Sequence, residues 1–153
     1  MLRGAIRYMY LDTIAFHRLR ELAPSLLSDC PALGFVSFND AIPPAFPPDE
    51  SANASDGHPV AKWLFTPRSD GVPKWLGHSL NSSADQWSAM MDQLKAAFSN
   101  ASSPASFCIC FCFPPVPHDF IVPFDMINEM TGERLLLVQS PNTFLLFRFP
   151  IIC

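Results

Sequence analysis

Four apolar runs of strand length occupy the last third of the sequence and constrain its fold more than any other feature. The runs are separated by residues that favour turns, chiefly proline, glycine and asparagine. Because the connections are short, we expect neighbouring runs to pair antiparallel and to form a C-terminal meander. The third run contains Leu135 to Val138, which is apolar on both faces, so its strand should be central in the sheet or covered by another chain. The four runs span residues 106–113, 120–127, 133–139 and 143–149.

Two segments that precede these runs have the periodicity of amphipathic helices. The first carries an apolar stripe over residues 11–22. The second, at about residues 84–100, follows two serines, with Asp85 and Gln86 placed to complete a capping box. A short apolar run at residues 33–38 indicates one more strand.

The order of these elements predicts the α+β class. Helix, strand, loop, helix and four strands do not alternate as βαβ units do. Two helices would pack on one face of a mostly antiparallel sheet of about five strands. The alternative is a mixed sheet that the run at 33–38 joins in parallel. At this length we expect a single domain over residues 1–153, with a mobile Pro/Ser-rich loop at about residues 39–58, while the place of residues 1–10 stays open.

The charge balance argues against a nucleic-acid partner. Charged residues make up only 16% of the chain, and its net charge is −4. Affinity for a phosphate backbone comes from lysine and arginine, which number ten here. No apolar run approaches the roughly eighteen residues that a membrane span requires, so the sequence predicts no transmembrane segment.

Three of the five cysteines alternate with apolar residues in the first C-terminal run. On a strand this spacing directs Cys108, Cys110 and Cys112 to one face. A zinc site with His118 would need the sulfurs to converge on one ion, which a regular strand prevents. We therefore expect buried thiols, no metal and no cofactor, in an intracellular reducing compartment such as the cytoplasm or an organelle matrix.

The sequence contains none of the common catalytic or phosphate-binding motifs. His118 and Asp119 are adjacent, but neighbouring side chains diverge and do not form a base with its orienting partner. No catalytic residue is predicted. A small enzyme is kept as an alternative, with a cysteine or histidine site assembled from distant residues, between Pro115 and Asp119 and in the loop around His58.

The pattern V-x-K-W-L occurs twice, at residues 60–64 and 72–76. A tryptophan beside a lysine can anchor an acidic or aromatic group of a partner. The alternative interpretation is that each tryptophan covers the core while each lysine stays in solvent. The candidate partner-binding residues are Lys62, Trp63, Arg68, Lys74 and Trp75.

Apolar side chains exceed what one core of this size readily hides, most clearly at residues 144–153. Such an excess usually marks a partner site. The sequence therefore predicts a non-catalytic protein-binding or assembly subunit of a larger multi-protein complex, with other protein chains as partners in a hetero- or homo-oligomer. A secreted glycoprotein is a further alternative, because Asn53, Asn81 and Asn100 each begin an acceptor motif.

Overall fold

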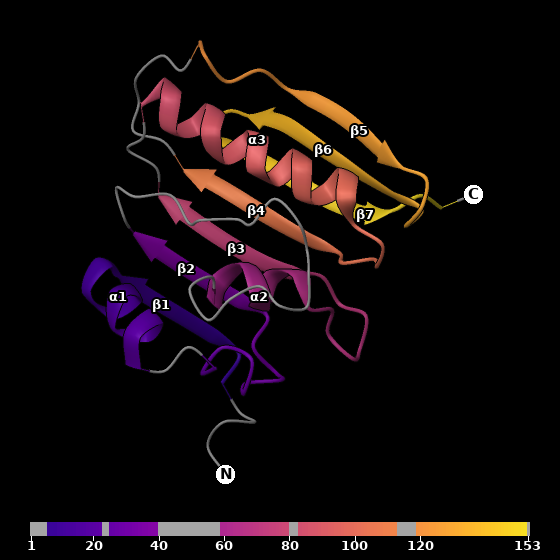
Figure 1. Cartoon of the computed structure of the whole chain (residues 1–153). Helices are drawn as coiled ribbons and strands as arrows, with labels where there is room; N and C mark the ends of the chain where they lie inside the picture. The colour runs from indigo at the N-terminus through magenta and orange to yellow at the C-terminus, as the bar shows by residue number, and fades with distance from the viewer. Residues whose placement is uncertain (1–5, 23–24, 40–58, 80–82, 113–118, 153) are drawn as a thin grey trace.

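Within the described residues, seven strands form one sheet, and three helices pack against it (Figure 1). The structure is a computed structural model that describes residues 6–22, 25–39, 59–79, 83–112 and 119–152. The elements in chain order are β1 (Tyr8–Asp12), α1 (Thr13–Leu22), β2 (Phe35–Asn39), α2 (Pro59–Phe65), β3 (Lys74–Ser79), α3 (Ala84–Asn100), β4 (Phe107–Cys112), β5 (Phe124–Asn128), β6 (Glu133–Ser140) and β7 (Thr143–Pro150).

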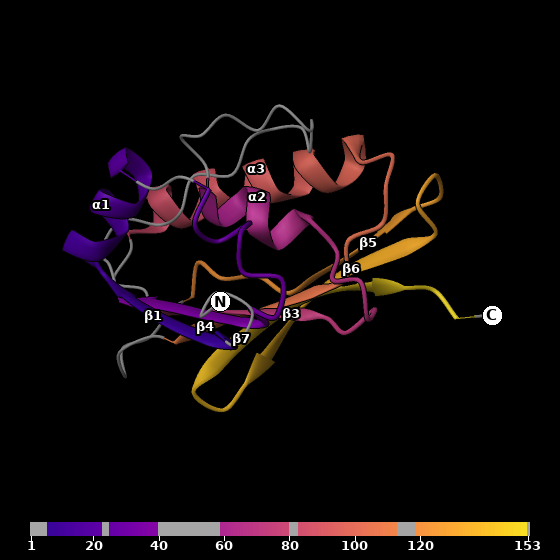
Figure 2. The ribbon, with the colours of Figure 1, turned by 90° about the horizontal axis from the view of Figure 1, so that it is seen from below.

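The first half of the sheet is parallel. Strands β1, β2, β3 and β4 lie side by side in chain order, and each connection between them carries one helix. Crossovers between parallel strands almost always have the same hand, so successive helices fall on the same side of the sheet. Figure 2 shows all three helices on one face.

The second half of the sheet is antiparallel. Strand β7 pairs with β4, β6 pairs with β7, and β5 pairs with β6 at the edge, which gives the order β1-β2-β3-β4-β7-β6-β5. The turn between β5 and β6 ends at Gly132, whose φ of +68° is readily adopted by glycine. Two residues, Pro141 and Asn142, join β6 to β7.

The α+β class and the C-terminal meander are confirmed. The sequence predicted two helices and about five strands, whereas the described residues form three helices and seven strands. Strand β2 is parallel to both neighbours, as in the mixed-sheet alternative. The meander comprises β5, β6 and β7, while β4 pairs with β7 and not with β5. The reason lies in the side chains: β7 is apolar on both faces and suits the interior of the sheet, whereas Asp125 and Ile127 of β5 are exposed at its edge.

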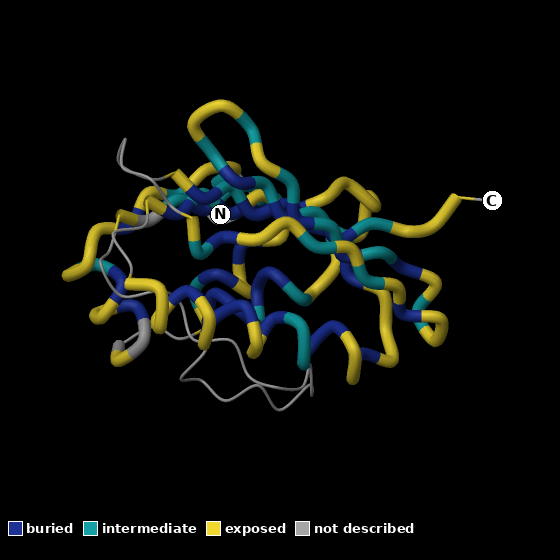
Figure 3. The backbone as a smooth tube through the Cα atoms, turned by 90° about the horizontal axis from the view of Figure 1, so that it is seen from above, coloured by how far each residue is buried: buried dark blue, intermediate teal, exposed yellow. Residues whose placement is uncertain are grey.

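The main core lies between the helices and the sheet, and α3 covers its antiparallel half. The predicted capping box is formed by Ser83 and Gln86: the Ser83 hydroxyl accepts from the Gln86 N–H at 3.3 Å, and the Gln86 side chain accepts from the Ser83 N–H at 3.1 Å. Figure 3 shows that the buried residues concentrate where helices and sheet meet. The apolar stripe of α3 is buried at Trp87, Met90, Met91, Leu94, Ala97 and Phe98.

A buried ion pair fastens the connection between α3 and β4 to the sheet. Arg148 of β7 donates through Nε to Oε2 of Glu133 on β6 at 2.8 Å, and neither side chain is more than 1% exposed. The other carboxylate oxygen of Glu133 accepts from the Ala105 N–H at 2.9 Å, and Arg148 Nη2 donates to the Ser103 carbonyl at 3.0 Å. The pair therefore satisfies the backbone of this connection as well as itself.

A buried amide joins the C-terminus of α3 to the turn after β5. The Asn128 side-chain nitrogen donates to the carbonyls of Phe98 and Ala101 at 2.7 and 3.0 Å. Its oxygen accepts from the N–H groups of Met130 and Thr131 at 2.9 and 3.2 Å. All four hydrogen-bonding positions of the amide are occupied.

Several predicted features fall outside the described residues. These include residues 1–5 and all but the first residue of the loop predicted at about 39–58. No helix in the part of the chain that the structure describes is long and apolar enough to cross a membrane.

Candidate functional site

The face of the sheet opposite the helices is the main unusual surface of the protein. Side chains alternate across each strand, so every second residue points away from the helices. None of the described helices lies on that side (Figure 2). We call this surface the open face; its central part is formed by Tyr8, Tyr10, Phe35, Ser37, Trp75, Gly77, Cys108, Cys110, Cys112, Leu136, Val138, Leu145, Phe147 and Phe149.

The strand register aligns aromatic and aliphatic side chains in one row across the open face. Neighbours in this row are paired residue by residue across six strands. Its most accessible members are Tyr8, 69% exposed, and Trp75, 43% exposed. The Phe35 ring lies 6.1 Å from the rings of both Tyr8 and Tyr10, which makes an aromatic cluster at the β1 edge. From β1 to β6 the row runs Tyr8, Phe35, Trp75, Cys108, Phe147 and Leu136.

Charge on the open face is confined to its outer strands. At one end Asp12 of β1 accepts from the Ala15 N–H at 2.7 Å and so caps α1. At the other edge Arg134 of β6 forms an ion pair with Asp125 of β5. The arginine lowers the pKa of Asp125, and the carboxylate raises that of Arg134. Strands β2, β3, β4 and β7 contribute no charged residue to this face.

The three cysteines of β4 share the open face, as predicted from their spacing. Cys108 is buried, Cys110 is half-buried and Cys112 is exposed, and the sulfurs of Cys110 and Cys112 lie 3.9 Å apart. Burial raises the pKa of Cys108 to about 12, with a contribution from Cys110. Burial and then Cys112 raise that of Cys110 to about 11. A nucleophilic cysteine needs a lowered pKa, so these two thiols are poorly suited to covalent catalysis.

The described residues contain no group of three or more cysteine, histidine or acidic side chains that could hold a metal ion. His118, which would complete a zinc set with the β4 cysteines, lies outside the described part of the chain. So do His58 and Pro115 of the proposed enzyme site, while Asp119 is described and exposed.

The predicted partner-binding residues separate into buried and accessible ones. Trp63 is only 2% exposed, and its indole nitrogen donates to the Leu33 carbonyl at 3.3 Å. Lys74 is also buried, with its ammonium group donating to the carbonyls of Trp63 and Thr66 at the C-terminus of α2. Trp63 and Lys74 are thus both buried in this fold, and their role as partner-binding residues stays a prediction.

The two V-x-K-W-L segments thus have opposite orientations. In α2 the tryptophan points into the core and Lys62 is half-buried at the surface, whereas in β3 Lys74 points inward and Trp75 lies on the open face. The phase of β3 is set by Leu76, which packs in the core on the same side as Lys74. Arg68 lies between the two segments, where Asp70 holds it in a two-bonded ion pair.

Lys74 provides a pH-dependent test of this arrangement. Burial, and secondarily Arg68, lowers the pKa of Lys74 to about 8 from its ordinary 10.5. Between pH 8 and pH 10.5, Lys74 is still protonated in the unfolded chain but loses its proton in the folded chain. The free energy of unfolding should therefore rise with pH over this range. We expect the difference in unfolding free energy between the wild type and Lys74→Met to grow in favour of the wild type from pH 8 to pH 10.5, as measured by urea denaturation. A difference that stays constant from pH 8 to pH 10.5 would contradict the assignment.

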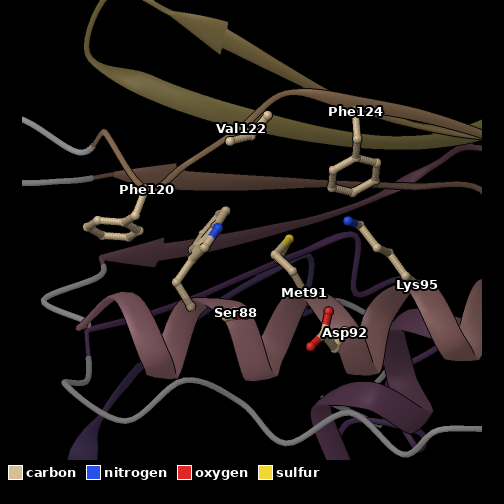
Figure 4. Close-up of a pocket in the computed structure, with 8 residues that line it drawn as sticks. Ser88, Met91, Asp92, Lys95, Phe120, Val122 and Phe124 are labelled. Atoms are coloured by element: carbon tan, nitrogen blue, oxygen red, sulfur yellow. The ribbon is translucent and has the colours of Figure 1, made fainter.

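A pocket of about 130 Å³ lies between α3 and the segment that leads into β5 (Figure 4). Ligand sites for small molecules usually enclose about 300–1,000 Å³. The ammonium group of Lys95 lies 4.3 Å from the centre of the Phe124 ring and narrows one end of the pocket. No cysteine or histidine lines it. The pocket is therefore smaller than an ordinary small-molecule site, and its lining does not include the cysteine or histidine on which the enzyme alternative was predicted.

Comparison of the chain with protein-family models, with curated proteins and with solved structures finds no match. A function therefore has to be inferred from the residues of this chain. Sequence reasoning identified Trp75 and the three β4 cysteines, but it did not place them on one surface. That surface is created by the pairings of β1 with β2 and of β4 with β7, and no local sequence pattern predicts either pairing.

Proposed function

We propose that the protein is a non-catalytic protein-binding or assembly subunit and that its open face is where another protein chain docks. The observation that carries this proposal is the continuous row of apolar side chains on a sheet face that no described helix covers. A sheet normally buries both faces when both are apolar. Large exposed apolar patches usually mark interaction sites.

The dimensions of the open face support a protein partner. Seven strands at a spacing of about 4.8 Å span about 29 Å, and strands of five to eight residues are about 17–26 Å long. The resulting planar area of about 500–750 Å² is comparable to the roughly 800 Å² that each partner contributes to a standard interface. Its aromatic residues and its lack of charge in the middle resemble the buried core of such interfaces.

The chemistry of the open face favours a protein over a nucleic acid. Exposed aromatic side chains on a sheet can stack on bases, but such binding also needs basic side chains along the phosphate path. Among the described residues of this face the only basic side chain is Arg134, and Asp125 already neutralises it.

We further propose that the protein acts in an intracellular reducing compartment. The four cysteines in the described part of the chain are free thiols. Two of them, Cys110 and Cys112, are accessible and have their sulfurs close together. Such thiols persist in compartments where glutathione and thioredoxin keep them reduced.

Thiol protection in an extract of the native source tests the docking proposal without knowledge of the partner. We expect Cys110 and Cys112 to be protected from a maleimide reagent in the wild type and to react in Leu145→Arg. Leu145 pairs directly with Cys110, so the introduced charge should expel a partner from this part of the open face. Labelling at each cysteine is read by mass spectrometry of the tryptic peptides.

Two controls make this experiment specific. Ala89→Arg introduces the same charge on the exposed side of α3 and should keep both thiols protected. Cys30, which is buried in the helix-covered core, should stay unlabelled in every variant unless the fold is lost. Equal and rapid labelling of Cys112 in the wild type and in Leu145→Arg would show that nothing covers the open face, and would refute the proposed function.

A further inference from the structure

We propose that the chain which covers the open face is a second copy of this protein, packed face to face about a two-fold axis with the β4 cysteines at its centre. This inference rests on the proposed function, because it names the partner for the same surface. It is carried by three properties of the open face: its charge distribution, its size and the position of β4 within the sheet.

The charge distribution permits the surface to pack against itself. In a two-fold interface the same patch is contributed by both copies, so a central charge would face or closely approach its own equivalent. Strands β2, β3, β4 and β7 contribute no charged residue to the open face. The pair of Arg134 and Asp125 at the β5 edge is neutral as a unit. Because the centre of this surface carries no charge, packing it against its own copy brings no like charges together there.

The size and shape of the open face fit a second sheet. Two sheets pack face to face at a separation of about 10 Å, with their apolar side chains interdigitated as the core of a sandwich. A partner that covers the whole face must itself be apolar, twisted and about 29 Å wide. Among the described surfaces of this chain, the open face has this form, and an identical copy supplies a matching one (Figure 2).

The position of β4 fixes which residues meet. Strand β4 is fourth of seven in the sheet order, and Cys110 is the middle one of its three cysteines on the open face. When the two equal faces cover each other completely, the two-fold axis passes between their centres, whatever the angle between the strands. Cys110 should therefore lie opposite Cys110 of the other copy.

The mass in solution is the first test. Under reducing conditions, light scattering after size-exclusion chromatography should give twice 17.0 kDa for the wild type. Leu145→Arg should raise the dimer dissociation constant by about 100-fold or more, because it places two equal charges near the centre of the interface. Ala89→Arg, with its charge on α3, should remain a dimer. Circular dichroism and thermal unfolding establish that both variants are folded.

Cross-linking tests the geometry. A variant that keeps Cys110 as its only cysteine should form a covalent dimer with a bifunctional thiol reagent that spans about 10 Å. The matched control replaces that cysteine with alanine and introduces Ala89→Cys instead, and it should give no covalent dimer. Efficient cross-linking of the control, or a dimer that Leu145→Arg leaves intact, would overturn the face-to-face arrangement.

The outcomes also separate this inference from the proposed function. If the wild-type protein is monomeric at all concentrations while Cys112 is protected in the native source, the proposed homodimer is wrong. The proposed function then stands, with a different protein as the partner. A monomer whose Cys112 is labelled freely in the source would overturn both. If the mass in solution increases only when nucleic acid is added, the partner is a polyanion and the proposed protein partner is wrong.

Discussion

Replacing Arg148 by methionine is expected to lower the free energy of unfolding by about 3–5 kcal/mol. The substitution leaves the Glu133 carboxylate buried without its cation, and it also removes the donor to the Ser103 carbonyl. The guanidinium group in addition lies 5.3 and 5.8 Å from the ring centres of Phe98 and Phe107. Domains of this kind are stable by only about 5–15 kcal/mol, so this single change should remove a large part of the total.

A double-mutant cycle distinguishes the buried charge from lost packing. Glu133→Leu alone should be as damaging as Arg148→Met, because it leaves the arginine buried without its anion. The double variant should be more stable than either single variant, since no isolated charge remains. Urea denaturation at one fixed protein concentration measures the loss of unfolding free energy for the two single variants and the double variant. A double variant with the sum of the two single losses would show that the pair acts only through packing.

Replacing Asn128 by leucine should cost about 2–4 kcal/mol, because two carbonyls lose a partner in a buried place and two half-buried N–H groups lose theirs as well. Asn128→Asp is the more informative change. It keeps the acceptor for Met130 and Thr131, but at neutral pH it directs a carboxylate oxygen at the carbonyls of Phe98 and Ala101. The folded state should then favour the protonated acid, so this variant should gain stability relative to the wild type as the pH falls.

Urea denaturation at neutral and mildly acidic pH measures this dependence. Asn142→Asp, in the exposed turn between β6 and β7, is the matched control and should differ little from the wild type at either pH. If Asn128→Asp lost no more stability than Asn142→Asp, the amide would not be the link between α3 and the β5–β6 turn.

The parts of the fold that the sequence predicted are those encoded by neighbouring residues. Helix α3 has its cap, its acidic first turn and its apolar stripe within one segment. The strands of the meander are bounded by their own turn residues. Helix α2 has only seven residues and would not be stable alone. Two long-range hydrogen bonds hold α2 in place. The Trp63 indole donates to the Leu33 carbonyl, 30 residues away, and the Lys74 ammonium donates to the Trp63 carbonyl, 11 residues away.

The candidate site was predictable in composition but not in position. The apolar residues on both faces of β6 and β7 indicated that something must cover them, and the β4 spacing indicated one face for its cysteines. Neither pattern says which side the helices take. The two V-x-K-W-L segments show the limit most directly, because adjacent side chains diverge in a helix and in a strand alike. Trp63 points into the core and Trp75 onto the open face because of contacts with residues that are distant in the sequence.

The place of β7 also has a consequence for assembly during synthesis. It follows the other described elements in the chain, yet it lies inside the sheet, where it joins the parallel half at β4 to its hairpin partner β6. Until the ribosome has released Thr143–Pro150, strand β4 keeps an unpaired, apolar edge. The nascent chain therefore presents a template for aggregation until β7 is available for pairing, and a chaperone that shields this edge would raise the yield of native protein.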